Sequence, residues 1–162
     1  MAKHTRNLYI PCLDDDVLGG TNSGTPDWKA IDLSTIFELG FNPNEETFAY
    51  IKDANDYTEI TGYKMAMEQE IVMDTSSDIY VSMRDFMMGL PTGSSAVVPT
   101  LIVMPDMVTD APTVGYRWSN ATVTPKTINS VDGKLTFTLN LNGTPTPGTV
   151  TISGSTITFT PS

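Results

Sequence analysis

The sequence predicts a mainly β protein, a two-sheet sandwich or barrel with one flanking α-helix. Short segments of alternating apolar and polar residues recur along the chain with turn residues between them. Only residues 77–88 show a convincing helical period. Charged residues make up only 17% of the 162 residues, and this length suits one domain with a sizeable core. We therefore expect a single domain over residues 1–162.

The segment from Tyr63 to Asp74 has the clearest strand pattern. One face carries the apolar residues Tyr63, Met65, Met67, Ile71 and Met73, interrupted by Gln69, and the other carries Lys64, Glu68, Glu70 and Asp74. Side chains of a strand alternate between its two faces, so the pattern predicts a half-buried strand with one apolar and one mainly acidic face.

The helix follows directly. Its apolar stripe consists of Ile79, Tyr80, Met83, Phe86 and Met87, of which we expect Ile79, Met83, Phe86 and Met87 to pack against the rest of the fold. Side-chain oxygens of residues 75–78 are expected to cap the first amides, and Gly89, followed by Leu90 and Pro91, ends the helix.

The segments before residue 63 predict strands and an acidic hairpin. Residues 28–41 and 47–52 are expected as strands, with a break at residues 42–46 because proline cannot donate to a ladder. A turn at residues 53–56 leads back through residues 57–63, so that a protruding hairpin spans about residues 42–62. Residues 1–24 are expected to be loop-like, with Asp14, Asp15 and Asp16 in solvent, since the distal glutamate of a calcium loop is missing.

The segments after the helix predict the remaining strands. Residues 96–104 suit a strand that Pro99 confines to an edge or a bulge, and residues 114–123 and 126–130 suit short strands. Residues 135–142 alternate strictly, and a hairpin is expected to turn at residues 153–155.

Charge and cysteine content exclude several classes of function. The net charge is −10, and all of this excess lies in residues 1–78, which hold fifteen acidic and five basic residues. Such a balance disfavours nucleic-acid binding by attraction. The only cysteine, Cys12, excludes an intrachain disulfide. The sequence shows neither a secretory leader nor a long apolar run, so we expect no membrane association and synthesis in the cytoplasm.

The residues do not predict an enzyme. His4, on a charged terminal segment, is the only histidine, and the sequence contains none of the nucleophile-elbow, phosphate-loop or zinc-protease motifs. Glu68 and Glu70 have a spacing that acid–base chemistry could use, but nothing in the sequence predicts a pocket around them. We expect no catalytic, cofactor-binding or metal site. The alternative to a structural role is a non-catalytic binding module for carbohydrates or surfaces, which would remain monomeric.

The order of motifs resembles the major tail tube protein of long, non-contractile-tailed bacteriophages. The strand TFAYIKD, the step YTEITGY, the acidic strand MEQEIVMD and one helix follow each other, with LSTIFELGFNPNEET before them and YRWSNATV and a C-terminal FTPS after them. The resemblance covers roughly residues 28–162. It implies a virion protein, made in the host bacterial cytoplasm, whose sheets join into stacked hexameric rings around a channel for DNA.

The resemblance also implies roles and partners. The polar face of the 63–74 strand, with Lys64, Glu68 and Glu70, is the candidate channel lining, where carboxylates would keep DNA from adhering. The candidates for contacts between rings are in the acidic hairpin: Asn44, Glu45, Glu46, Asp53, Asn55, Asp56 and Glu59. Expected partners are further copies of the chain and other tail proteins, such as the tape measure and the terminator.

Overall fold

The computed structural model describes residues 8–31, 34, 36–52, 54–106 and 111–162. In chain order the elements are β1 (Ile10–Asp14), α1 (Asp15–Leu18), β2 (Trp28–Ala30), β3 (Leu39–Gly40), β4 (Pro43–Phe48), β5 (Tyr57–Tyr63), β6 (Met65–Val72), α2 (Asp78–Met88), the 3-10 turn η2 (Gly93–Ala96), β7 (Thr100–Met104), β8 (Val114–Trp118), β9 (Thr122–Asn129), β10 (Lys134–Leu141), β11 (Thr146–Ser153) and β12 (Thr156–Pro161).

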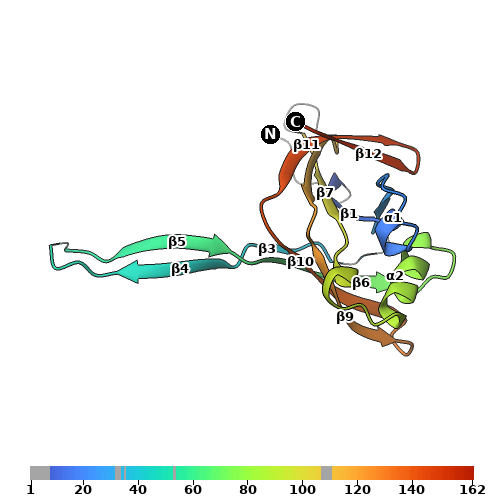
Figure 1. The fold of residues 1–162 in the computed structure, drawn as a ribbon, viewed down its shortest axis with the longest axis horizontal. Coiled ribbons are helices and arrows are strands. Elements are labelled where there is room, and N and C mark those ends of the chain that lie inside the picture. The colour runs from blue at the N-terminus through green and yellow to red at the C-terminus, as the bar shows by residue number, and fades with distance from the viewer. Residues whose placement is uncertain (1–7, 32–33, 35, 53, 107–110) are drawn as a thin grey trace.

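The strands form three antiparallel units (Figure 1). Six of them close a barrel in the order β1-β2-β12-β11-β8-β7, and four form a sheet in the order β3-β6-β10-β9. The remaining pair, β4 and β5, projects from the body as a two-stranded ribbon. The predicted fold class, mainly β with one flanking helix, is confirmed.

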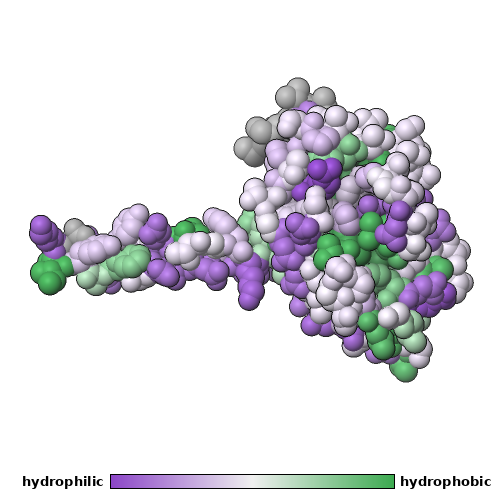
Figure 2. Space-filling view, in the orientation of Figure 1, coloured by the Kyte–Doolittle hydropathy of each residue, from purple (hydrophilic) through white to green (hydrophobic). Residues whose placement is uncertain are grey.

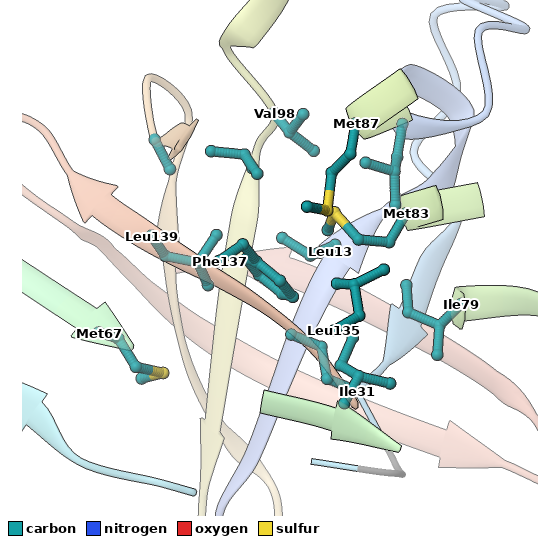
Figure 3. Close-up of a cluster of buried hydrophobic side chains, with 14 of the residues drawn as sticks. Leu13, Ile31, Met67, Ile79, Met83, Met87, Val98, Leu135, Phe137 and Leu139 are labelled. Atoms are coloured by element: carbon teal, nitrogen blue, oxygen red, sulfur yellow. The ribbon is translucent and has the colours of Figure 1, made fainter. Parts of the chain in front are cut away.

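The main core lies between α2 and one face of the four-stranded sheet. Met83 of α2 and Phe137 of β10 are both almost fully buried, and both belong to this core with Leu13 of β1. Figure 3 shows Met83 and Met87 pointing from α2 toward Leu13 and Phe137. A second, smaller core around Trp28, Leu101 and Val150 fills the barrel.

The helix is confirmed, but its predicted cap is wrong. Ile79, Met83 and Met87 are buried as expected, whereas Phe86 is only half-buried and packs on the edge of the core. Ser77 occupies the N-cap position without a side-chain hydrogen bond to the helix. The oxygen available nearby, Oδ1 of Asp74, instead accepts from the backbone N–H and hydroxyl of Ser76, which closes the preceding turn.

The predicted strand over residues 28–41 is wrong, because the chain changes sheets there. β2 ends at Ala30 in the barrel, and the N–H of Ile31 donates to the carbonyl of Pro11. Ser34 then makes an isolated bridge to Ile71 of β6, and β3 joins the four-stranded sheet.

The predicted break at residues 42–46 is also wrong. β4 starts at Pro43 and ends at Phe48, four residues short of the predicted strand end. Both strands of the ribbon are edge strands, so a proline that cannot donate a hydrogen bond fits there. Asn42, directly before β4, has a positive φ of 43°.

Pro99 does not place its strand at an edge. β7 begins at Thr100, directly after the proline, and pairs with β1 on one side and β8 on the other. The carbonyl of Pro99 accepts from the N–H of Asp14, which ties the approach of β7 to the end of β1.

Between β8 and β9 the chain turns at Ser119 and Asn120, so the predicted strand over residues 114–123 is divided into two. The C-terminal predictions are confirmed. β10 alternates strictly, with Leu135, Phe137, Leu139 and Leu141 buried, and β11 and β12 form the hairpin around Gly154.

The acidic segment near the N-terminus is not a solvated loop. Asp14 ends β1, Asp15 and Asp16 begin α1, and the carboxylates of Asp14 and Asp16 are nearly buried. Oδ1 of Asp14 accepts from the backbone N–H of Asp16 and of Asp27, although burial raises its pKa. His4 lies outside the described residues.

Candidate functional site

β6 separates a buried face from a polar face, as its alternation predicted. Met67 and Ile71 are buried in the main core, whereas Glu68 is exposed and Glu70 is half-buried on the opposite side. The register with β10 places Glu68 opposite Thr138 and Glu70 opposite Thr136. We call the outward side of the four-stranded sheet, with Glu68, Glu70, Lys126, Lys134, Thr136 and Thr138, the polar sheet face.

Gln69 belongs to the buried face, although the sequence pattern suggested an interruption. Its side-chain amide donates to the carbonyls of Ile36, at 3.2 Å, and Glu68, at 2.9 Å. Its Oε1 accepts from the hydroxyl of Ser34 at 2.7 Å. These bonds satisfy a polar side chain that is only 1% exposed, and they attach the segment before β3 to β6.

The polar sheet face carries both signs of charge. Nζ of Lys134 lies 2.9 Å from Oε1 of Glu70, and this pair raises the pKa of the lysine. Lys126 of β9 lines a shallow groove of about 270 Å³ together with Glu68 and Glu70. Two lysines therefore accompany the two glutamates, and the face carries both signs of charge rather than carboxylates alone.

Hydroxyl and amide groups fill the rest of this face. The hydroxyls of Thr127 and Thr136 lie 2.6 Å apart, and the amide of Asn140 donates to Oγ1 of Thr124 at 3.0 Å. Neither lysine and none of these cross-strand pairs was predicted for this face from the sequence. The strict alternation of residues 134–141 contained a signal for Lys134, but nothing local indicated that β9 would lie beside β10.

Lys64, the third predicted channel residue, is not on β6. It lies between β5 and β6 at the base of the ribbon, where its N–H donates to the carbonyl of Asn42 and its own carbonyl accepts from the Asn42 side chain. The structure therefore places Glu68 and Glu70 on one face of β6, while Lys64 lies just before the strand begins.

Both edges of the four-stranded sheet are largely open. At one edge β3 pairs only with Ala66 and Met67, and Ser34 adds a bridge to Ile71. At the other edge β9 has an isolated bridge to Val97 at Thr122, and the described part of the chain puts no further strand against it. An open edge with unpaired backbone groups is a template for pairing with another chain.

The ribbon carries the residues predicted to contact other rings. Asn44, Glu45 and Glu46 lie on β4, Glu59 lies on β5, and Asn55 and Asp56 lie in the connection, all of them exposed, whereas Asp53 falls outside the described residues. Glu46 and Glu59 are directly opposed in the register. Like charges in that position destabilise a strand pair, so the isolated ribbon is electrostatically unfavourable.

Large apolar side chains are exposed on the same ribbon. Ile51 at its far end is fully exposed, and Tyr50, Tyr57, Ile60 and Tyr63 are more than half exposed. Figure 2 shows hydrophobic side chains at the tip and further along the projection, between hydrophilic ones. A two-stranded ribbon is at best marginally stable by itself in water, and exposed apolar patches of this kind are typical of interaction surfaces.

The described residues contain no group of three or more histidine, cysteine, aspartate or glutamate side chains placed to hold a metal ion. Among them, no helix is long and apolar enough to span a membrane.

No protein-family model and no curated protein sequence matches the chain. Several solved structures have a similar fold. A chain of the anti-feeding prophage baseplate, determined with six-fold symmetrisation, has 11% identity and a TM-score of 0.50 over 88% of this chain and 91% of that one. A chain of the sheath/tube terminator of the extracellular contractile injection system PVC has 9% identity and a TM-score of 0.52 over 88% and 95%.

A third similar chain belongs to the tube-terminating cap of the anti-feeding prophage, with 10% identity and a TM-score of 0.51 over 100% of this chain and 93% of that one. At such identities the comparison establishes a shared fold, extending over nearly the whole of each chain.

Proposed function

We propose that this chain is a structural subunit that assembles with copies of itself into hexameric rings, which stack into a hollow tail tube. The observation that carries the proposal is the four-stranded sheet. One face of it is buried under α2, the other is polar, and both of its edges are open. Edge-to-edge pairing between copies would continue the sheet into a ring with the polar face inside, and a head-to-tail interface of this kind closes when the rotation allows.

The similarity of fold supports the same proposal, since the similar chains come from a baseplate, a tube terminator and a tube cap. The motif order of the sequence favours the tube of a long, non-contractile phage tail as the particular setting. There the rings would convey viral DNA, meet the tape measure and terminator proteins, and form part of the virion after synthesis in the host cytoplasm.

The mixed charge of the polar sheet face suits a channel through which DNA passes without binding. Lys134 neutralises Glu70, and Lys126 shares the groove with Glu68. A wall of this composition offers no cluster of free cations for phosphate groups, whose binding depends on released counterions.

Electron microscopy of the purified protein over a series of concentrations, at low and high salt, tests the proposal. We expect hollow hexameric rings and stacks of rings. Six copies at −10 each bring a charge of −60 into one ring, so added salt, which screens charge beyond about 8–10 Å at physiological strength, should favour stacking. Single rings that never stack would indicate a terminator, and a monomer at all concentrations would contradict the proposal.

A further inference from the structure

A groove of about 450 Å³ lies between the barrel and the start of α2. Its apolar lining includes Ile10 of β1, Ile79 of α2 and Ile157 of β12, and its polar lining includes Lys29 and Asp78. Ile152 and Ser155, beside the β11–β12 turn, complete its exposed side. The volume falls within the range of about 300–1,000 Å³ that is typical of ligand pockets in proteins.

The groove and the ribbon are at opposite ends of the molecule. Figure 1, drawn with the longest axis horizontal, shows β4 and β5 projecting to one side, and α2 and the β11–β12 hairpin tip on the other. The ribbon of one copy therefore cannot reach its own groove, and it projects away from the body, where only another molecule could meet it. Such an arrangement is head-to-tail, which is the geometry that generates rings and filaments.

The tip of the ribbon matches the groove in chemistry. Ile51 is the most exposed large apolar side chain described, and Tyr50, which stacks on Phe48, supports it from the ribbon. The tip also carries a cation and an anion, Lys52 and Asp56. The groove has Lys29 and Asp78, so Lys52 and Asp56 can each meet a residue of opposite charge there.

We propose that the ribbon tip of one copy docks into this groove of a second copy, with Ile51 seated among the isoleucines. Lys52 then faces Asp78, and Asp56 faces Lys29. Burial in the groove removes the apolar tip from water, which is the driving force for the contact. The inference rests on the proposed self-assembly, and it assigns the surface that receives the ribbon.

Cysteine cross-linking tests the contact directly. Two single variants, Ile51→Cys and Ser155→Cys, are mixed under conditions of assembly and oxidised with diamide. Both positions are exposed, so neither substitution disturbs the core. The native Cys12 does not compete, because it is fully buried and burial raises the pKa of its thiol to about 12, whereas disulfide formation needs the thiolate. The control replaces Ser155→Cys with Val131→Cys, at an exposed turn elsewhere.

We expect disulfide dimers from the Ile51→Cys and Ser155→Cys mixture, and no more than background from the control mixture. A second test replaces Ile51 with aspartate, which brings a charge into the apolar groove near Asp78. Ile51→Asp should lose stacking while its melting temperature as a monomer is unchanged, and Val131→Asp should stack like the wild type.

Electron microscopy of the same samples separates the two proposals. If rings or stacks form but Ile51→Cys does not cross-link to Ser155→Cys, or Ile51→Asp stacks normally, the docking site is overturned and the tube proposal is unaffected. If every sample remains monomeric and no dimer forms, both are overturned.

Discussion

Glu70 of β6 and Lys134 of β10 form an ion pair, 2.9 Å from Oε1 to Nζ, across the two central strands of the four-stranded sheet. The pair changes the expectation about the channel. The acidic strand face in the sequence predicted a channel wall that repels DNA. Lys126 lines the same groove as Glu68, however, so the wall carries both positive and negative charges. The relevant property is then a mixture of both charges rather than an excess of carboxylates.

This property predicts the effect of a charge reversal. Glu68→Lys leaves the polar sheet face with three lysines against one glutamate, so assembled tubes should retain DNA, with a binding constant that falls as salt rises. The substitution is on an exposed strand position and should leave assembly intact. The measurement is DNA retention by tubes across a salt series.

The matched control is Asp85→Lys, which makes the same change of net charge on the exposed side of α2. It should retain no more DNA than the wild type. Equal retention by both variants would show that Glu68 is not in the passage.

The packing of α2 gives a prediction about stability. Met83 is completely buried between the helix and the sheet, whereas Met88, at the end of the same helix, is 70% exposed. Met83→Ala should reduce the free energy of unfolding by about 2–5 kcal/mol, and Met88→Ala by no more than about 0.5 kcal/mol. Denaturant unfolding of the monomers measures both. Equal losses would mean that α2 does not cover the core as described.

The barrel depends on close approach at two glycines. Gly115 and Gly148 are opposite each other on β8 and β11, and the ring of Phe159 lies over both of them. A Cβ at Gly148 would meet the carbonyl oxygen of Thr160, and would come within 2.6 Å of Cε2 of Phe159. Gly148→Ala should therefore cost about 1–3 kcal/mol or more through overpacking.

Gly62→Ala is the comparison for this substitution, because a Cβ there would have only Asn44 nearby, at 3.8 Å. Thermal melting of both variants is the measurement. A Gly148→Ala protein as stable as Gly62→Ala would contradict the close packing of Phe159 on the two strands.

The carboxylate of Asp16 makes the stability of the fold depend on pH. Its carboxylate accepts hydrogen bonds from the backbone N–H and hydroxyl of Ser23 and from the N–H of Gly24, and these bonds lower its pKa. The stabilisation is complete above the usual aspartate value of about 3.9 and is lost as pH falls through the lowered pKa. The melting temperature of the wild type should therefore fall over this acidic range.

The melting temperature of Asp16→Asn should decrease less than that of the wild type as pH falls. The variant should also be less stable than the wild type near neutral pH. Asp56→Asn, at an exposed position on the ribbon, should follow the wild-type profile. Parallel profiles for the wild type and Asp16→Asn would show that the carboxylate does not stabilise the loop through its charge.

Local periodicity was enough to predict part of this fold. The alternation in β6 and β10 and the helical stripe of α2 follow from which side chains face the core, and this is visible within a few residues. Burial of Gln69 was not predictable in this way. Its partners, Ser34 and Ile36, are more than thirty residues away and meet it only when β3 joins the sheet.

The same reason explains the errors at the acidic segment and the polar sheet face. Backbone N–H groups of residues 23–27 donate hydrogen bonds to the carboxylates of Asp14 and Asp16. Because these donors lie seven or more residues further along the chain, the three adjacent aspartates resembled a solvated loop in the sequence. Lys126 joins Glu68 and Glu70 through the pairing of β9 with β10 and of β10 with β6. Such registers are set by tertiary packing, which single-strand patterns do not contain.

The most direct test of the account is a cryo-electron microscopy map of the assembled protein. We expect the four-stranded sheet to be the innermost layer, with Glu68 and Lys126 facing the channel and α2 on the outer side of that sheet. An assembly in which α2 or the closed barrel lines the channel, or one without a channel, would contradict the account.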